Sequence, residues 1–479
     1  MNRNNGLKTF ALVAAVFLVL SWLRLDPGSG EQTVRGGSAG QDGGTAGDDD
    51  GDIGALDEVV DPTNPQSNLV NDPTATGPDP KGLECARGKN GGATDKGVTP
   101  TSIRLASTAV LDGPAKSLLE DSPNAMKAVV DKVNKAGGIC GRLLELRIVN
   151  DSFKADDGLR IIKNFIAEGY FALPVVPSAE GLGSAITSGE IAKAKIPVVG
   201  SDGMRKEQYA EPYVWPVASA TVTAMRVMAK YGYENRAARS FAIVYDSKYR
   251  FGIEGRDAFR DQVRALGGEV KAEIDLDPDL PSYGSKVAEF NGAGKCGQGK
   301  CDMVAMLLLP ETATKWLKGN PERALRYTAG AQTLFTDRFA ADCVQQYGTK
   351  CEGMAVWTGY NPPIGPLASL PGVSTYVNDV RAVKANIDVT NQFVEGAYLG
   401  MSVFVEALRK VGPNLTRERL KAVMDSMTFT SDLSSPLTWA PGRHYANTRA
   451  QSFAMTVSQG TFRGWRNEGT GFLQDPAFG

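Results

Sequence analysis

The chain has 479 residues and a mass of 51.0 kDa, which is too long for one compact core and indicates two or three domains. Its 42% hydrophobic and 22% charged residues exclude a polytopic membrane protein and wholesale disorder. The net charge of −2 hides an uneven distribution, because residues 36–80 hold ten acidic and no basic residues and residues 81–479 carry +6. That excess is too small and too dispersed to indicate a nucleic-acid partner.

The N-terminal segment indicates export. Arg3 and Lys8 precede the apolar run Phe10–Leu23, which is the pattern of a secretory signal. At about 1.5 Å per residue the run spans roughly 21 Å, which is shorter than the ~30 Å hydrocarbon core of a membrane. Flanking leucines lengthen the apolar segment, so an uncleaved membrane anchor is the alternative to a cleaved signal. The first cysteine after the run is Cys85, which argues against a lipid-modified cysteine. We expect residues 1–25 to be a signal sequence or membrane anchor, and the body to be extracytoplasmic, secreted or tethered to the outer face of the membrane.

Residues 26–97 are predicted to form a flexible linker. The segment is acidic and rich in glycine and proline, and it holds few large apolar residues. Such a chain cannot bury enough apolar surface to offset the entropy lost on ordering. We expect it to hold the body away from the membrane.

The body alternates strands and helices. Ser122 is the expected N-cap of a helix with Pro123 at its first position, and double glycines end this helix and a later one. The double glycines suggest two similar lobes, although glycine is common at any helix C-terminus. Strands are predicted at Ile103–Val110, Leu143–Val149, Phe171–Val176, Ile196–Gly200, Phe241–Tyr245, Val270–Ile274 and the fully buried Met303–Leu309, with helices around Ile186–Ala194 and Glu254–Leu266 between them. This order predicts an α/β fold with parallel sheets covered by helices.

Six cysteines support an oxidising compartment. They allow fifteen pairings, and free thiols are the alternative. Spacing favours a tight loop from Cys296 to Cys301 and a bridge from Cys343 to Cys351, which leaves Cys85 with Cys140. The chain has no Cys-x-x-Cys pair, so zinc is not expected.

Catalytic and cofactor motifs are weak. His444 is the single histidine, and its place near the chain end predicts a surface residue rather than a general base. Gly292–Gly297 matches a dinucleotide fingerprint by letter, but it follows a helix and precedes a strand, which is the reverse of the required order. We therefore predict no enzyme activity, no metal and no cofactor.

From about residue 98 onward the sequence resembles the type I periplasmic substrate-binding proteins, in particular the leucine/isoleucine/valine-binding group. No one motif is diagnostic, but their succession follows the family order over roughly 380 residues. The segments that carry the resemblance are Leu111–Pro114, Gly137–Arg142, Val149–Asp151, Val176–Glu180, Ile196–Asp202 and Tyr245–Gly252.

The resemblance implies two Rossmann-like lobes with parallel central sheets, joined by three crossing segments. One lobe would take residues 98–217 and 356–436, and the other residues 218–355 and 437–479. A ligand would lie in the cleft at the carboxyl ends of the strands, and closure of the lobes would enclose it.

The resemblance also implies site residues. Ser178, with the amide of Ala179, matches the position that holds a ligand carboxylate, and Ser201 and Asp202 match the next loop. The same serines and aspartates would cap helices without any ligand.

Three further positions depart from the family pattern. Phe251, which with Tyr249 is expected to contact the ligand, replaces a tyrosine and cannot donate a hydrogen bond. Asp112 stands where serine is frequent, and the amine-binding glutamate falls near Gln332, where no carboxylate occurs. Either Asp202 or Asp112 supplies that charge, or the ligand is not an amino acid.

The leading hypothesis is a non-catalytic extracytoplasmic solute-binding protein. It would capture a small polar ligand, amino acid-like or a small carboxylate or amide, and present it to an ABC transporter permease. The alternative is a membrane-tethered sensor or scaffold of the same fold that transports nothing. A secreted α/β hydrolase is disfavoured because no Ser–His–Asp set is placed.

Overall fold

The structure is a computed structural model that describes residues 90–218, 220–292, 296, 301–319 and 327–478. The predicted signal or anchor and residues 26–89 of the predicted linker lie outside the described residues, as does Cys85. None of the helices within the described residues is both long enough and apolar enough to cross a membrane.

A first parallel sheet is built from the N-terminal part of the body. A parallel bridge between Leu105 and Ala172 joins its two ladders, β1–β2 and β3–β4–β5. Leu105 and Ala106 belong to different apolar clusters, because successive side chains of a strand point to opposite faces, so helices cover both faces. The strands are β1 (Ser102–Ala109), β2 (Leu143–Asn150), β3 (Leu173–Pro174), β4 (Val198–Val199) and β5 (Val214–Trp215).

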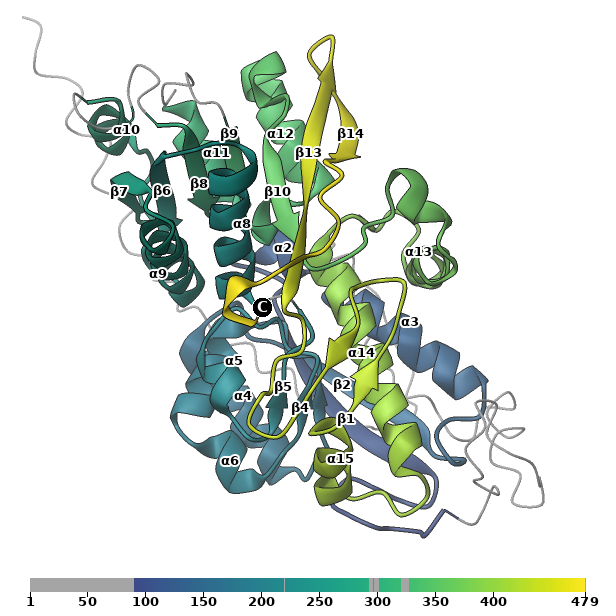
Figure 1. Ribbon diagram of the computed structural model, residues 1–479. Coiled ribbons are helices and arrows are strands. Elements are labelled where there is room, and N and C mark those ends of the chain that lie inside the picture. Colours follow the sequence, from purple (N-terminus) through teal and green to yellow (C-terminus); the bar gives the residue numbers. More distant parts are fainter. Residues whose placement is uncertain (1–89, 219, 293–295, 297–300, 320–326, 479) are drawn as a thin grey trace, which may run out of the picture. The chain divides into compact units, whose positions relative to one another are not determined.

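The helices around this sheet form two layers. One layer contains α3, α14 and α15, and Figure 1 shows α3 and α14 beside β1 and β2. The other contains α4 and α5. The helices are α2 (Lys116–Leu119), α3 (Ser122–Lys135), α4 (Ala155–Ala167), α5 (Ala179–Thr187), α6 (Glu190–Ala194), α7 (Glu207–Ala210), α13 (Pro371–Val383), α14 (Gln392–Val411) and α15 (Arg417–Met424).

A second, eight-stranded sheet follows the order β14-β13-β10-β9-β8-β6-β7, and β15 pairs with β13. Pairing is parallel from β7 to β10 and antiparallel at β13, β14 and β15. All five residues of β8 are buried, which confirms the predicted fully buried parallel strand. The strands are β6 (Ser240–Asp246), β7 (Glu269–Leu276), β8 (Met303–Leu307), β9 (Tyr327–Gly330), β10 (Ala355–Thr358), β13 (Arg449–Ser458), β14 (Thr461–Asn467) and β15 (Leu473–Gln474).

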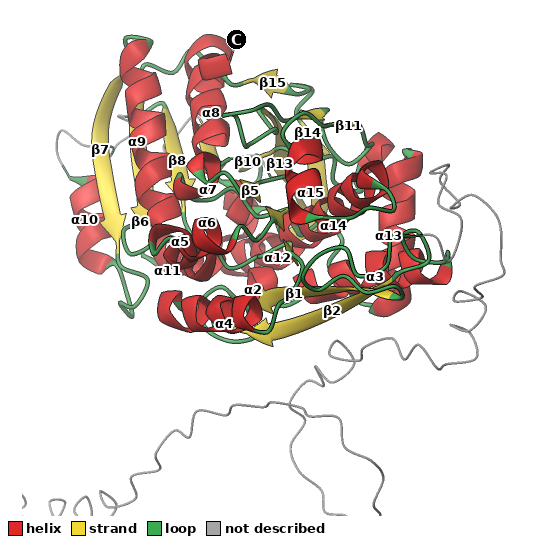
Figure 2. Ribbon diagram, turned by 90° about the horizontal axis from the view of Figure 1, so that it is seen from below, coloured by secondary structure: helices red, strands yellow, loops and turns green. Residues whose placement is uncertain are grey.

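Helices cover this sheet as well. Phe241 and Ile243 of β6 pack into one apolar cluster, whereas Ala242 and Val244 pack into another. Figure 2 shows α9 beside β7 and α8 next to α9. The helices are α8 (Thr221–Asn235), α9 (Arg250–Ala265), α10 (Gly284–Asn291), α11 (Pro310–Lys318) and α12 (Asp337–Tyr347).

The chain passes between the sheets three times, after β5, after β10 and before β13. A two-stranded antiparallel pair, β11 (Thr428–Phe429) with β12 (Leu437–Thr438), precedes the third passage. The predicted fold class, α/β with two Rossmann-like lobes and three crossings, is confirmed. The lobe boundaries stay a prediction, and the one expected at residue 356 falls inside β10.

Some helix and strand bounds predicted from the sequence differ from those in the structure. Ser122 lies inside α3 and Asp121 is the N-cap. The helix expected at Ile186–Ala194 is two helices, because Gly189 adopts a positive φ of 75° between them. The strand expected at Phe171–Val176 shortens to β3.

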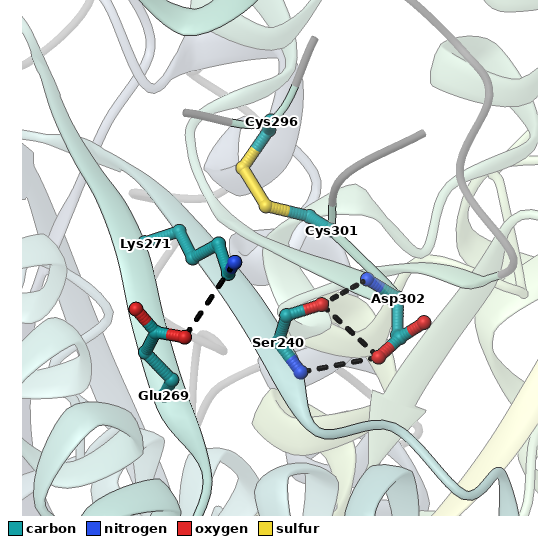
Figure 3. The surroundings of a disulfide bond; sticks show 6 residues. All are labelled: Ser240, Glu269, Lys271, Cys296, Cys301 and Asp302. Atoms are coloured by element: carbon teal, nitrogen blue, oxygen red, sulfur yellow. Dashed lines mark hydrogen bonds and ion pairs between the residues drawn. A yellow bond between two sulfur atoms is a disulfide. The ribbon is translucent and has the colours of Figure 1, made fainter. Parts of the chain in front are cut away.

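Disulfide bonds join Cys296 to Cys301 and Cys343 to Cys351, as predicted. Cys140 is also disulfide-bonded, but its predicted partner Cys85 lies outside the described residues. Figure 3 shows the first bridge just before β8. Next to it, the Asp302 carboxylate accepts hydrogen bonds from the Ser240 amide at 3.1 Å and hydroxyl at 3.0 Å. The bridge thus closes a loop whose end is fastened to the start of β6.

Gly138 forms the tight turn between α3 and β2. Its φ is +71°, and a Cβ added there would lie 2.1 Å from the Arg142 carbonyl oxygen. We expect Gly138→Ala to lower the free energy of unfolding by more than the ~1–2 kcal/mol cost of a left-handed alanine, as measured by urea denaturation.

Gly189→Ala is the control for this prediction, because that glycine has φ +75° and its Cβ would meet nothing within 4 Å. If both variants lost the same free energy of unfolding, the close contact between the added Cβ and the Arg142 carbonyl oxygen would not be destabilising.

Candidate functional site

A small cavity lies where strands of both sheets end. Val175 and Pro177 follow β3, and Ser201 and Asp202 follow β4. Gln332 follows β9 in the other sheet. The first turns of α14 and the first two passages between the sheets complete the wall. The lining residues are Val175, Pro177, Gly200, Ser201, Asp202, Ala218, Gln332, Tyr360, Gln392, Phe393, Gly396 and Ala397.

The cavity is narrow. Its volume is about 20 Å³, which is enough for about one water-sized group. Its position at the carboxyl ends of parallel strands is where doubly wound sheets bind ligands.

Asp202 is the one charged side chain among the described lining residues. Its Oδ1 accepts hydrogen bonds from the Met204 amide at 3.1 Å and from Gln208 Nε2 at 2.9 Å. Its Oδ2 is buried and has no partner among the described residues. Burial raises the pKa of Asp202 to about 6, although the bond from Gln208 opposes this shift.

Three neutral side chains of the cavity wall also hold polar atoms without a partner among the described residues. They are Ser201 Oγ, Gln332 Oε1 and both amide atoms of Gln392, all buried. A buried polar atom without a partner costs about 1–3 kcal/mol. Such atoms gathered around one cavity therefore indicate a site that receives a polar molecule.

An apolar cluster adjoins the cavity through Phe393, which belongs to both. In the cluster, Phe153 meets Tyr249 edge to face at 5.4 Å, and Tyr249 stacks on Phe251 at 6.1 Å. Ala179 packs in the same cluster. The predicted site residues Tyr249, Phe251 and Ala179 thus lie beside the cavity and do not line it.

The other predicted residues divide between the cavity and its surroundings. Ser201, Asp202 and Gln332 lie together in the cavity wall. Ser178 is fully buried, and its hydroxyl lies against Asp151, whose pKa burial raises to about 6 while the Ser178 hydroxyl lowers it. Asp112 is exposed and accepts a hydrogen bond from Asn150 Nδ2 at 3.3 Å.

A charged network borders Asp202. Arg205 donates to Glu180 at 3.1 Å and to Glu207 at 2.6 Å. The Lys206 amide donates to Glu254 of α9 at 2.9 Å, which ties the β4 loop to the second sheet's helices. The positive charge of Arg205 is therefore engaged by two carboxylates.

Sequence reasoning did not find the contribution of α14. Gln392 and Glu395 are polar residues at the start of a long apolar helix, and Asn391 caps it by accepting from the Phe393 amide. Glu395 is fully buried with neither oxygen partnered among the described residues, and burial raises its pKa well above the usual value. Buried polar residues in an apolar helix were the available signal.

His444 is not at the surface, contrary to the prediction. It is 6% exposed, stacks on Trp215 at 5.3 Å, and its Nδ1 lies 3.1 Å from the Val214 carbonyl oxygen. Burial lowers its pKa, so it is a neutral core residue at pH 7.

The periplasmic binding protein family model matches residues 102–461, and the chain belongs to that family. It is a family of solute-binding proteins. No curated protein sequence matches the chain.

Solved structures show the same fold at low identity. A fatty acid ABC transporter substrate-binding protein from Thermomonospora curvata is 18% identical, with a TM-score of 0.66 over 84% of this chain and 96% of that one. A solute-binding protein from R. palustris in complex with 4-hydroxybenzoate is 14% identical, with a TM-score of 0.64 over 78% and 97%. A leucine-binding protein from Thermotoga maritima is 14% identical, with a TM-score of 0.62 over 76% and 99%.

The raised pKa of Asp202 makes stability depend on pH. Between about pH 4 and pH 6 the folded chain holds a proton that the unfolded chain releases, so stability from this group is present below that range and is lost as the pH rises through it. Asp202→Asn removes the charge and keeps the shape. We expect the variant to gain roughly 3 kcal/mol over the parent above about pH 7 and little below about pH 4, as measured by urea denaturation.

Asp156→Asn, at an exposed aspartate of α4, is the control and should shift stability by roughly 0.3–1 kcal/mol. If the free energies of unfolding of Asp202→Asn and its parent differed by the same amount at every pH, this result would contradict a buried charge at Asp202.

Proposed function

We propose that this chain is an extracytoplasmic solute-binding protein that captures a small polar ligand between its two lobes and presents it to an ABC transporter permease. Membership in the periplasmic binding protein family and the likeness to ABC transporter substrate-binding proteins support this role. The observation that carries it is the cavity at the carboxyl ends of the strands, whose wall includes Ser201, Asp202 and Gln332, each with a buried polar atom that has no partner among the described residues.

The contacts around the cavity fit a ligand that holds the lobes together. Ser117 Oγ donates to Glu311 of α11 at 2.6 Å, and the Lys206 amide reaches Glu254. Each bond links a segment that follows a strand of the first sheet, α2 after β1 or the loop after β4, to a helix of the second sheet. Such polar contacts at the rim are weak singly, so a bound ligand contributes the larger part of closure.

The disulfides support an oxidising, extracytoplasmic setting. Export through the N-terminal segment, and tethering by it if it is not cleaved, remain part of this proposal. The permease would meet the rim formed by both lobes.

A thermal-shift screen of amino acids, amides and small carboxylates tests the proposal. A ligand that binds only the folded chain must raise the melting temperature. For the best ligand we expect Ser201→Ala to weaken binding about two- to tenfold, which corresponds to one hydrogen bond, and Ser178→Ala to weaken it less because that hydroxyl faces Asp151. Calorimetric titration measures both.

A larger loss in Ser178→Ala than in Ser201→Ala would place the ligand elsewhere. If no solute raises the melting temperature, transport loses its support and the sensor or scaffold role takes its place.

A further inference from the structure

The polar atoms of the cavity are mostly acceptors. Asp202 Oδ2 and Gln332 Oε1 can only accept, and Ser201 Oγ and Gln392 Oε1 can accept as well. They come from the β4 loop, the turn after β9 and the start of α14. Four acceptors from three elements therefore belong to residues that line one cavity of about 20 Å³.

The charge of Asp202 lacks a counter-ion. Among the described residues that line the cavity, none is a lysine, arginine or histidine. The guanidinium of Arg205, which interacts electrostatically with Asp202, already binds Glu180 and Glu207. A buried carboxylate without a partner is strongly unfavourable, so a cation in the cavity would remove this cost.

The space suits a head group with several donors. A volume of about 20 Å³ accepts about one water-sized group, and an ammonium group is of that size. It carries three N–H donors and no acceptor, which matches a wall of acceptors. A carboxylate would meet Asp202 with like charge.

The described residues give a ligand carboxylate no equivalent place in this cavity. The Ser178 hydroxyl, expected to bind it, lies against Asp151. Asp112, the other acid considered for an amine, is exposed and lies outside the cavity wall. The described cavity residues therefore offer acceptors to the amino group of an α-amino acid but no equivalent place for its carboxylate.

We infer that the cavity binds the protonated amino group of a small amine, with Asp202 as its counter-ion and Ser201, Gln332 and Gln392 as further acceptors. This inference rests on the proposed function and names the ligand class. The ligand is an alkylammonium compound, and its apolar part extends past Phe393 of the cavity wall into the apolar cluster to which Phe393 also belongs.

Four probes that share a propyl or propionyl chain test it: n-propylamine, propan-1-ol, propionamide and propionate, at equal ionic strength near pH 8. We expect n-propylamine to raise the melting temperature most and propionate not at all. Asp202→Asn should weaken amine binding roughly tenfold or more, because it removes a desolvated charge partner. Asp156→Asn, with the same change of charge at an exposed site, should bind the amine as the parent does.

The pH dependence gives a second readout. Besides Asp202, the groups that face the site are Glu180 and Arg205, which bind each other, and the hydroxyls of Tyr209 and Tyr360. Burial also raises the pKa of Glu395 of α14 well above its usual value. Asp202 lies in the cavity wall and its pKa is about 6, so amine binding should fall as the pH drops through this value. Binding that stays constant to pH 5 would overturn the inference.

The outcomes separate this inference from the proposed function. A response to propionate or propionamide but not to the amine would show that the site binds solutes and that the ligand class is wrong. No response to these probes or to any solute of the wider screen would count against the proposed function itself. The probe series on the parent chain decides the ligand class even if Asp202→Asn does not fold.

Discussion

Strand β4 and helix α14 meet backbone to backbone, and the site depends on that contact. A Cβ added to Gly200 would lie 2.8 Å from the Gly400 Cα, and one added to Gly400 would lie 2.9 Å from the Gly200 Cα. Only a pair of glycines permits this approach. It brings the first turn of α14, and with it Gln392, to the same cavity as Ser201 and Asp202.

The same close packing explains the narrowness of the cavity. Gly396 lies one turn before Gly400, and a Cβ there would lie 2.7 Å from the Tyr360 hydroxyl oxygen. Tyr360 follows β10 of the second sheet, so α14 contacts both the first sheet and a segment between the sheets. Small residues on one face of α14 thus set the distance between the β4 loop and Tyr360. The polar atoms in between are held near one another and away from water.

Much of this architecture could be predicted from the sequence, because it depends on local patterns. The apolar run at Met303–Leu309 and the alternation of strands and helices follow from burial on both faces of a parallel sheet. The cysteine loop at Cys296 and Cys301 followed from short spacing. The cavity did not follow from such patterns, since Gln332, Tyr360 and Gln392 are far apart in sequence and meet only through the topology.

The resemblance indicated residues in two neighbouring loops, and the structure places them differently relative to the cavity. Ser178 and Ser201 both follow short strands of the first sheet, yet only Ser201 lines the cavity. Gly158 of α4 and Gly181 of α5 let Asp151 approach α5, because a Cβ on either glycine would lie within about 3 Å of its Oδ2. Asp151 and the Ser178 hydroxyl thus lie close to each other at Gly181, and neither residue lines the cavity. His444 shows the same limit, because the Trp215 face that buries it comes from a strand some 230 residues earlier.

Cavity size and the neighbouring aromatic cluster are physically linked. The cavity admits about one water-sized group, so the remainder of any ligand must occupy space that side chains now fill. Phe393 belongs both to the cavity wall and to the cluster in which Phe153 meets Tyr249. Phe153 follows β2 of the first sheet and Tyr249 follows β6 of the second, so parting this pair opens the region beside the cavity. Because the cluster is apolar, separating the lobes without a ligand would lose the favourable free energy of packing Phe153 against Tyr249. The head group of a suitable ligand would pair with the Asp202 carboxylate. Its apolar part would replace the contact between Phe153 and Tyr249. Such a ligand would supply both the charge pairing and the apolar contact energy.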